Sequence, residues 1–367
     1  MRNPSNTGWT YRRGDSMIGP RPEVASLKPY HIPEVSARII LSANESPYNL
    51  PQSIIDEIKG QFDAIAYNRY PDPLSLELRT LIGEHYGLGP EKVFVGNGGD
   101  EVIQNLYLAY GGVGRKAVTF EPMFEVYGIT GRMTGTEMIT ILRSPGDFTA
   151  EKVLPHAYMM DAALIFICCP NNPTADLVSL EAIEALLKIT NALVVVDEAY
   201  AEFSGQTALP LLAKYKNLAI LRTFSKAFSL AGLRAGYLLA SDEVIENLLK
   251  VKLFFNFNKL SQVIARIAFL HRTIFEEKIK VILADRDRLF AQMKKLAGIE
   301  VFPSHANFIL FRTKKPAAEV WQGVLDRGIL IRNTSNQLLL ENCLRVTVGT
   351  PEENKEFMKA LSEVIER

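Results

Sequence analysis

Short apolar runs alternate with helical patterns through the middle of the chain. Several runs are continuously apolar, which is typical of strands that helices cover on both faces. Between two of them, Leu180, Ile183, Leu186 and Leu187 recur at the spacing of one helix face. The runs that we predict to be strands span residues 92–95, 117–120, 138–142, 163–168, 193–196, 218–221 and 235–239. This alternation predicts an α/β fold whose sheet is mostly parallel and doubly wound.

The pattern changes after about residue 260. A long helical stretch at 261–296 precedes three further predicted strands at 307–311, 329–332 and 343–348, and a closing helix carries Phe357 and Leu361 on one face. This part predicts a smaller α+β lobe, completed by the N-terminal segment. Because 367 residues are many for a single core, we divide the chain into an arm and joining segment (1–50), a large domain (51–265) and a small domain (266–367).

Composition argues against nucleic acid and membrane as partners. Hydrophobic residues make up 47% and charged residues 22% of the chain, as in soluble globular proteins. Lys+Arg and Asp+Glu are equal at 41 each, so no overall charge attracts nucleic acid or an anionic surface. No apolar stretch reaches the roughly eighteen residues of a membrane span, and the N-terminus lacks the apolar core of a signal peptide.

The chain has three cysteines, Cys168, Cys169 and Cys343. Two of them are adjacent within an apolar run, where buried thiols are favoured over a disulfide. This usage favours a reducing compartment, the cytoplasm.

Several common catalytic motifs are absent. The five histidines are scattered without the paired spacing of zinc ligands, so we expect no metal. The chain has no G-x-S-x-G elbow and no Walker lysine motif. Residues 96–101 (GNGGDE) are similar to a dinucleotide fingerprint, but Glu101 stands where its last glycine belongs.

Two loops that follow predicted strands could bind an anion or a hydroxyl group, since α/β sheets bind ligands at the carboxyl ends of their strands. In the loop 96–101, glycines such as Gly99 at a strand-to-helix turn would free backbone N–H groups for an anion. The alternative is a tight turn with Asp100 as a helix cap. In the turn 170–174 (PNNPT), Asn172 either bonds a ligand hydroxyl or only shapes the turn.

A third loop places an acid directly after a strand. Asp197 follows the apolar run 193–196 and is followed by Glu198, Ala199 and Tyr200. Burial at the rim of a sheet is costly for a carboxylate unless a cation pairs with it. A protonated pyridine nitrogen would be such a cation, and a helix cap or structural ion pair is the alternative.

The fourth loop brings together hydroxyl groups and cations. Thr223, Ser225 and Lys226 follow the strand 218–221, and Arg234 comes eight residues after the lysine. A lysine that forms a Schiff base must be neutral part of the time, so its pKa near 10.4 must fall by roughly three units, about 4 kcal/mol. A surface lysine and arginine on a helix are the alternative.

Together, the four loops supply a phosphate cradle, a buried acid, an Asn/Tyr pair and a nucleophilic lysine. This combination matches the needs of one cofactor, pyridoxal 5'-phosphate.

On these residues the sequence resembles the class I and II aminotransferases, the fold type I group of pyridoxal-phosphate enzymes. The resemblance runs from about residue 21 to residue 350 and rests on motifs at 44–47 (NESP), 68–72 (NRYPD), 99–101 (GDE), 170–174 (PNNPT), 197–200 (DEAY), 225–228 (SKAF) and 233–237 (LRAGY). The segments 331–333 (IRN) and 344–349 (LRVTVG) point to the histidinol-phosphate branch of the family. The resemblance implies a pyridoxal-phosphate-dependent aminotransferase of amino-acid biosynthesis that acts on L-histidinol phosphate and 2-oxoglutarate.

The resemblance also implies roles for matching residues. Lys226 would hold the cofactor as a Schiff base and then move the substrate's proton. Asp197 would keep the pyridine nitrogen protonated, Asn172 and Tyr200 would bond the phenolic oxygen, and Phe124 would stack on the ring. The cofactor phosphate would be held by the backbone of Gly99 and Asp100 with Thr223, Ser225 and Arg234.

Substrate binding and assembly follow from further matches. Arg345 would bind the carboxylate of glutamate or 2-oxoglutarate and, with Arg332 and Tyr30, the phosphate of histidinol phosphate, because a guanidinium fork suits both anions. Asn44, in the first motif, is also expected at the substrate. Tyr70 would reach the cofactor site of a neighbouring subunit, which implies a homodimer. For Arg332, a surface position at a strand end is the alternative.

The chain departs from the family pattern at two positions. Ala175 stands where relatives commonly have glycine, and Phe124 lacks a hydroxyl that many relatives carry. Alternative activities are transamination of an aromatic amino acid and decarboxylation of threonine phosphate. A non-catalytic pyridoxal-phosphate regulator is a third alternative, but the chain lacks a basic DNA-binding module.

Overall fold

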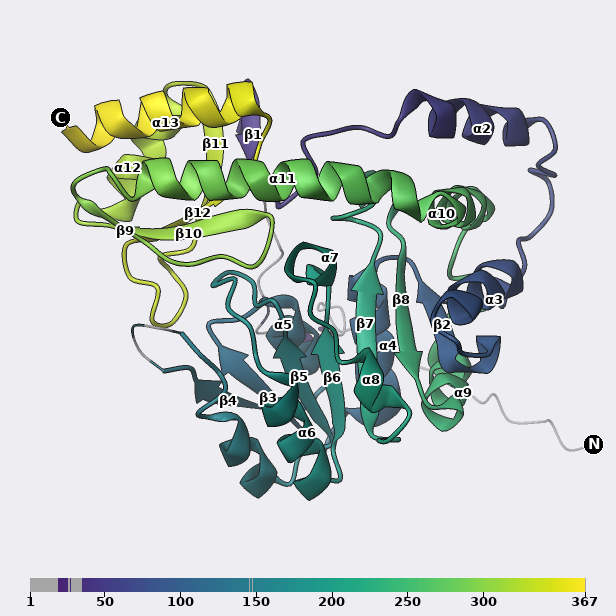
Figure 1. Cartoon of the computed structure of the whole chain (residues 1–367). Helices are drawn as coiled ribbons and strands as arrows, with labels where there is room; N and C mark the ends of the chain where they lie inside the picture. The colour runs from purple at the N-terminus through teal and green to yellow at the C-terminus, as the bar shows by residue number, and fades with distance from the viewer. Residues whose placement is uncertain (1–18, 26, 28–34, 145, 147, 367) are drawn as a thin grey trace, which may run out of the picture.

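Two sheets and a long helix between them organise the chain (Figure 1). The computed structural model describes residues 19–25, 27, 35–144, 146 and 148–366. In this part of the chain no helix is long and apolar enough to cross a membrane.

The larger sheet has seven strands in the order β2-β8-β7-β6-β5-β3-β4, and each of the seven central predicted strands occurs in it. Strands β3 to β7 pair in parallel, whereas β8 is antiparallel to both of its neighbours. The strands are β2 (Val93–Gly96), β3 (Lys116–Glu121), β4 (Glu137–Leu142), β5 (Leu164–Cys168), β6 (Leu193–Asp197), β7 (Leu218–Thr223) and β8 (Gly236–Ala240). The predicted, mostly parallel α/β sheet is therefore confirmed.

Helices cover both faces of this sheet. In Figure 1, α4 (Gly99–Tyr110) and α5 (Val126–Met133) lie behind it, and α6 (Leu180–Ile189) and α8 (Leu209–Leu212) lie in front. The predicted helix α6 begins after Ser179, whose hydroxyl accepts from the backbone N–H of Ala182 at 3.2 Å. The remaining helices of this part are α1 (Pro22–Ala25), α2 (Gln52–Phe62), α3 (Leu76–His85), α7 (Ala201–Ser204) and α9 (Asp242–Val251).

The alternation of side chains along the strands divides the core into two layers. Val195 packs in the core on the α4 side, whereas Val194 and Val196 pack in the core on the other side. By the same alternation, Asp197 shares the α4 side with Val195. The ends of the strands thus present different residues to the two faces.

The smaller sheet has five strands in the order β1-β11-β12-β10-β9. Its strands are β1 (Ile39–Leu41), β9 (Ile299–Val301), β10 (Phe308–Thr313), β11 (Ile329–Asn333) and β12 (Cys343–Thr347), and the helices α12 (Ala317–Leu325) and α13 (Pro351–Glu366) pack against it. β1 pairs in parallel with β11, so the N-terminal segment does complete this sheet. The domain boundaries at residues 50 and 265 stay a prediction.

The helical stretch predicted at 261–296 is helical over most of its length, and it consists of two helices. α10 (Lys259–Leu270) and α11 (Arg272–Met293) meet at His271, whose φ of −97° and ψ of 24° leave helical geometry. No glycine or proline marks this break in the sequence. In Figure 1, α11 runs across the top of the larger sheet toward the smaller one.

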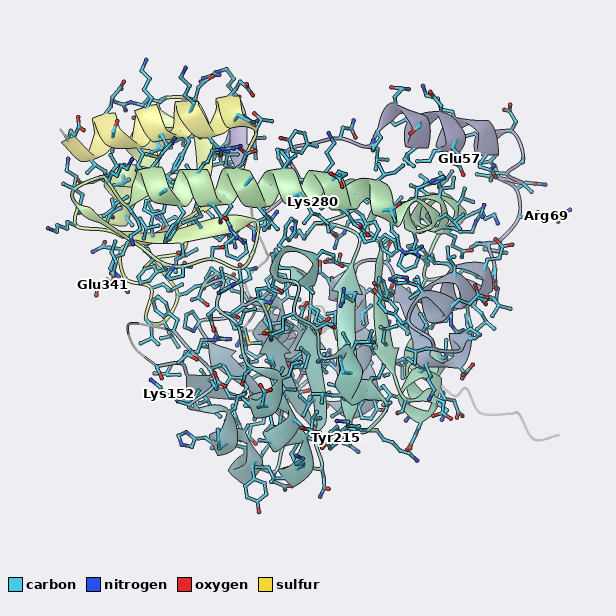
Figure 2. All side chains as sticks on the ribbon, viewed as in Figure 1. Glu57, Arg69, Lys152, Tyr215, Lys280 and Glu341 are labelled. Carbon is cyan, nitrogen blue, oxygen red and sulfur yellow. The ribbon has the colours of Figure 1, made fainter. Side chains whose placement is uncertain are left out.

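Charged side chains are spread over the surface of the molecule (Figure 2). Figure 2 shows Glu57 on α2 and Lys280 on α11 at the outside, and both are exposed. The three cysteines are free and buried.

Candidate active site

The glycine turn between β2 and α4 lies against the start of β8. Gly98 caps α4 with a φ of +88°, in the left-handed region that glycine adopts without strain. A Cβ on Gly98 would lie 2.7 Å from Nη2 of Arg234, and a Cβ on Gly236 would lie 2.7 Å from the backbone nitrogen of Gly99. The first backbone N–H groups of α4 and the Arg234 guanidinium therefore surround one place suited to an anion. The helix cap is Gly98 and not Asp100, which was the alternative from the sequence.

Thr223 and Ser225 are buried together at the end of β7. Their hydroxyl oxygens are 3.0 Å apart, and the backbone N–H of Ser225 donates to Oγ1 of Thr223 at 3.1 Å. Arg234 is exposed and forms an ion pair of 2.7 Å with the exposed Asp100 carboxylate. A guanidinium has five N–H donors, so Arg234 can bind a phosphate besides Asp100.

Asp197 is a buried carboxylate at the end of β6. Oδ1 accepts from the backbone N–H of Ala199 at 3.0 Å, and Oδ2 accepts from the hydroxyl of Tyr127. Burial raises the pKa of Asp197 to about 6, against the hydrogen bond from Tyr127, which lowers it. None of the ion pairs among the described residues involves Asp197. A cationic ring nitrogen would supply the missing charge, so this residue fits the predicted cofactor.

Lys226 lies in the loop after β7, half-buried and outside any helix. Its amine donates to the backbone carbonyl of Ala43 at 2.7 Å. Burial lowers the pKa of Lys226 to about 8, and the Arg345 guanidinium acts in the same direction. The shift has the direction that a nucleophilic lysine requires.

Tyr200 and Asn172 are tied to residues of the smaller sheet and of the segment before α2. The Tyr200 hydroxyl accepts from Nδ2 of Asn44 at 2.9 Å, and the backbone N–H of Asn44 donates to Oγ1 of Thr347 at 2.9 Å. Asn172 accepts from Nη1 of Arg345. The side chains predicted to bond the cofactor oxygen thus also join the two parts of the molecule.

The turn that carries Asn172 keeps its shape despite the alanine that follows it. Ala175 has a φ of 60°, in the left-handed region where the family commonly places glycine, and its N–H donates to the Asn171 carbonyl at 2.8 Å. The turn is also held from the side, since Nδ2 of Asn171 donates to the Thr174 hydroxyl at 2.6 Å. The departure at this position therefore leaves the loop in place.

Arg332 and Arg345 are partners across β11 and β12. They stand directly opposite each other in the antiparallel register, so their side chains leave the same face of the sheet. Arg345 is buried, its guanidinium lies 5.2 Å from the centre of the Phe308 ring, and Nη2 donates to the Ser42 carbonyl at 2.7 Å. Arg332 is half-buried and forms no ion pair or hydrogen bond with the described residues. Two arginines at opposite positions on one face of a sheet favour an anion between them.

For three further predicted residues the described part of the chain shows no contact with the predicted site residues above. Phe124 is half-buried beside Tyr127, with ring centres 5.7 Å apart at 87°. Tyr70 is exposed and stacks on Phe255, with centres 4.4 Å apart at 12°. Tyr30 lies outside the described residues.

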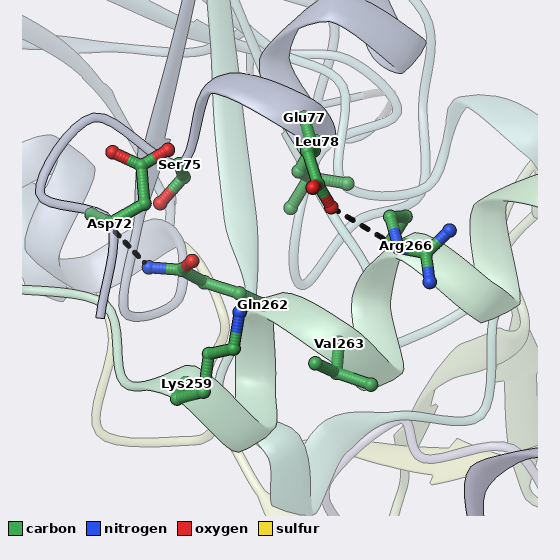
Figure 3. A pocket seen from close by; sticks show the side chains of 8 residues that line it. All are labelled: Asp72, Ser75, Glu77, Leu78, Lys259, Gln262, Val263 and Arg266. Atoms are coloured by element: carbon green, nitrogen blue, oxygen red, sulfur yellow. Dashed lines mark hydrogen bonds and ion pairs between the residues drawn. The ribbon is translucent and has the colours of Figure 1, made fainter. Parts of the chain in front are cut away.

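Contacts around a small pocket hold the segment that carries Tyr70. The pocket lies between the start of α3 and α10 (Figure 3), where Nε2 of Gln262 donates to the Asp72 carbonyl at 2.9 Å. Arg266 forms an ion pair of 3.7 Å with Glu77 at the other end. These contacts fix the base of the segment 68–72 and leave Tyr70 outward.

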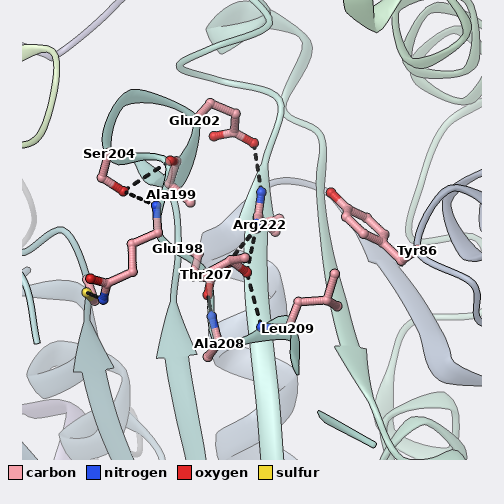
Figure 4. Close-up of polar contacts among 12 residues, drawn as sticks. Tyr86, Glu198, Ala199, Glu202, Ser204, Thr207, Ala208, Leu209 and Arg222 are labelled. Atoms are coloured by element: carbon pink, nitrogen blue, oxygen red, sulfur yellow. Dashed lines mark hydrogen bonds and ion pairs between the residues drawn. The ribbon is translucent and has the colours of Figure 1, made fainter. Parts of the chain in front are cut away.

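An ion-pair cluster crosslinks the ends of β6 and β7 (Figure 4). By the alternation of side chains along the strands, it lies on the face opposite Asp197. Arg222 contacts Glu198 at 2.6 Å and Glu202 at 3.1 Å, and its Nη2 donates to the Thr207 hydroxyl at 3.0 Å. Glu198 also accepts from the backbone N–H of Ala208 at 2.5 Å. Because Glu198 follows Asp197 and Arg222 precedes Thr223, the cluster fixes the strand ends that carry two site residues.

The sequence analysis missed this cluster and Tyr127. Glu198 and Arg222 were each visible beside a predicted site residue, but their pairing depends on strand neighbours that one sequence does not reveal. Tyr127 stands three residues after Phe124, the spacing of a shared helix face, and this was the available signal. Among the described residues no group of three or more His, Cys, Asp or Glu could hold a metal ion.

The chain is similar to known proteins over most of its length. The family model described as aminotransferase class I and II matches residues 37–361. The chain is 44% identical to histidinol-phosphate aminotransferase 1 of Carboxydothermus hydrogenoformans over 93% of this chain and 97% of that protein. It is 41% identical to histidinol-phosphate aminotransferase of Thermococcus kodakarensis over 94% and 97% of the two chains.

A solved structure shares the fold. The crystal structure of histidinol-phosphate aminotransferase from Sinorhizobium meliloti, in complex with pyridoxal-5'-phosphate, has a TM-score of 0.85 to this chain. It covers 96% of this chain and 98% of its own, at 24% identity.

The Arg222 cluster generates a prediction for stability. Arg222→Met should destabilise the fold by about 3–5 kcal/mol, because it leaves the buried Glu198 carboxylate and the half-buried Glu202 carboxylate without this cation. Burial already raises the pKa of Glu202, and loss of the guanidinium would raise it further. A carboxyl whose pKa is higher in the folded than in the unfolded chain loses stability as pH rises, so the deficit should be larger at about pH 8 than at about pH 5. Urea unfolding at the two pH values measures it.

Arg266→Met is the matched control, since its ion pair with Glu77 is long and largely exposed. We expect a change under about 1 kcal/mol. Two results would contradict the role of the cluster. One is that both substitutions lower the free energy of unfolding equally, and the other is that the loss caused by Arg222→Met is the same at both pH values.

Proposed function

Because the chain belongs to the class I and II aminotransferases, we propose that it transfers the amino group of L-histidinol phosphate to 2-oxoglutarate, with pyridoxal phosphate as cofactor. The observation that carries the substrate assignment is the cross-strand pair Arg332 and Arg345. A phosphate monoester has close to two negative charges near neutral pH. Two guanidinium groups on one face match that charge, and one of them suffices for the carboxylate of the second substrate.

The larger sheet would hold the cofactor. The backbone of Gly99 and Asp100, with Thr223, Ser225 and Arg234, would bind its phosphate. Asp197 would pair with its ring nitrogen, Asn172 and Tyr200 would bond its phenolic oxygen, Phe124 would stack on the ring, and Lys226 would carry it covalently. When bound, pyridoxal phosphate supplies an electron sink for the negative charge that develops on the substrate's α-carbon.

Lys226 would act as the base of the reaction. With a pKa of about 8, a useful fraction of its amine is neutral near neutral pH, so Nζ can accept the proton that leaves the α-carbon. The Ala43 carbonyl, 2.7 Å from Nζ, holds the amine near the start of the segment that contains Asn44. Asn44 in turn positions the Tyr200 hydroxyl at 2.9 Å, so both side chains depend on the same segment.

Arg345 would bind the anionic end of either substrate. Its contact with Asn172 and with the Ser42 carbonyl holds the guanidinium between the two sheets. Arg332 would join it for the phosphate of histidinol phosphate, with Tyr30 as a further contact. Asn44 would line the same space.

We further propose that the chain is a cytoplasmic homodimer. Four exposed apolar side chains lie on two segments of the larger domain, and the stacking of Tyr70 on Phe255 brings those segments together: Tyr70, Leu253, Phe254 and Phe255. Exposed apolar groups that gather in one place favour a protein interface. In a dimer through this surface, Tyr70 would be placed to reach the partner's cofactor. The free cysteines fit a reducing compartment.

The first prediction from the proposed function concerns the activity itself. Purified protein with pyridoxal phosphate, histidinol phosphate and 2-oxoglutarate should form glutamate, and Lys226→Ala should abolish that activity together with the visible absorbance of the bound cofactor. Release of carbon dioxide from threonine phosphate, or a higher kcat/KM for phenylalanine than for histidinol phosphate, would favour the alternatives. Absence of turnover with every amino donor would favour a regulator.

The second prediction concerns Arg332. Arg332→Ala should raise KM for histidinol phosphate about tenfold to hundredfold, the effect of losing a charged hydrogen-bonded contact. KM for 2-oxoglutarate should change much less, because Arg345 alone binds its carboxylate. Arg332→Lys should lie between, since it keeps the charge and loses the planar fork. Equal increases of both KM values would assign Arg332 to another role.

The third prediction concerns assembly. Phe254→Arg should shift the chain from dimer to monomer in analytical ultracentrifugation and lower its activity. Val113→Arg is the control, because Val113 is as exposed as Phe254 but lies in the turn before β3. A monomeric unsubstituted chain, or a dimer that survives Phe254→Arg, would contradict an interface at this surface.

A further inference from the structure

The hydroxyl group of Tyr127 is directed at the acid of the cofactor site. Tyr127 lies on α5, has no exposed surface, and donates to Oδ2 of Asp197. The other oxygen, Oδ1, accepts from the backbone N–H of Ala199 at 3.0 Å. Among the described residues each carboxylate oxygen therefore has one donor. One donor is a backbone N–H, and the other is the side chain of Tyr127.

Neighbouring rings fix the direction of this hydroxyl. The Tyr127 ring is stacked on Phe166 of β5, with centres 4.8 Å apart at 27°. On another side it meets Phe124 edge-on, with centres 5.7 Å apart. Phe124, which is proposed to stack on the cofactor, thus touches Tyr127, which contacts Asp197 and follows Phe124 by three positions.

Burial and two neighbouring carboxylates disfavour the charged form of Asp197. Burial raises the pKa of Asp197 to about 6, and the carboxylates of Asp100 on α4 and of Glu198 next in the chain also raise it. Cys168 at the end of β5 stays a neutral thiol, because burial raises its pKa well above the usual range. Burial also raises the pKa of Tyr127, so its phenol stays protonated and donates. A hydrogen bond to the charged form of an acid favours that form.

We propose that Tyr127 is a positioning residue that keeps the Asp197 carboxylate charged and correctly oriented, so that a proton shared with the cofactor resides on the ring nitrogen and not on the acid. The inference rests on the proposed use of pyridoxal phosphate. It adds a residue that contacts Asp197 and not the cofactor. Without the phenol, the carboxylate becomes a stronger base and takes up the shared proton more readily.

Tyr127→Phe tests this role, because it removes the hydroxyl and keeps the ring. The dissociation constant for pyridoxal phosphate, measured by equilibrium dialysis from about pH 5 to pH 8, should rise as pH falls through the titration of Asp197 in the empty site. In Tyr127→Phe the pH at which the dissociation constant begins to rise should move upward by about one pH unit, since a hydrogen bond to a charged group has about this strength. Relative to the unsubstituted chain, the dissociation constant should then be about fivefold higher near pH 6 and about tenfold higher near pH 5.

Tyr107 provides a matched control. It is also fully buried and also stacks on Phe166, with centres 5.3 Å apart at 25°, but its hydroxyl contacts the sulfur of Met138 at 3.6 Å. Tyr107→Phe should leave the pH dependence of the dissociation constant unchanged. If the two substitutions act alike on the dissociation constant and its pH dependence, the hydroxyl of Tyr127 has only a packing role and the inference is wrong.

A double variant separates the hydrogen bond from any change in folding. In the background of Asp197→Asn, which has no titrating carboxyl, Tyr127→Phe should have no further effect on cofactor affinity. A tenfold loss that persists there would overturn the inference. In the single variant, the nitrogen-15 shift of ring-labelled pyridoxal phosphate should move toward that of an unprotonated nitrogen, and an unchanged shift would contradict the proposal.

Failure of the proposed function would be distinguishable from these outcomes. If the unsubstituted chain did not bind pyridoxal phosphate, the cofactor assignment and this inference would both be wrong. If it bound the cofactor and Tyr127→Phe behaved like the unsubstituted chain, only the role of Tyr127 would be lost.

Discussion

A carboxylate that is buried without a cationic partner among the described residues is the constraint on which the proposed site depends. Asp197 comes at the end of an entirely buried strand, and its two hydrogen bonds offset only part of the cost of taking its charge out of water. The parallel register with β7, in which Asp197 stands opposite Leu221, puts the loop with Thr223, Ser225 and Lys226 at the same edge of the sheet. An acid that needs a cation and an amine that burial tends to neutralise therefore share one edge.

The two faces of that edge have separate tasks. On the α4 side are the acid and the hydroxyl groups that would meet a ligand, and on the other side Arg222 binds Glu198 and Glu202. The ion pairs there crosslink the same strand ends without entering the site. The ion pairs on one face thus hold the strand ends in place, and the side chains of the site on the other face are positioned by those strand ends.

Most of the fold could be predicted from the sequence because its strands are short, apolar and separated by clear helical patterns. The two strands that were missed, β1 and β9, have three residues each, too few for a periodicity to show. The break at His271 was missed because the helical pattern continues through it without glycine or proline. The loops with Lys226, Asp197 and Asn172 were visible because each combines unusual residues with a strand end. Tyr127 and the partners of Arg222 stand close to predicted site residues in the sequence, but their contacts could not be predicted, since a hydrogen bond between distant segments leaves no pattern along one sequence.

The antiparallel pairing of β11 with β12 has a consequence for how such proteins diversify. The arginines proposed to bind the substrate's anion lie on the smaller sheet, whereas most of the residues proposed to bind the cofactor lie at the end of the larger one. Changes in side chains on β11 can therefore alter which amine is accepted without disturbing the machinery that performs the chemistry. A gene duplicate with substitutions on that strand would therefore meet new metabolites with the same proposed cofactor residues.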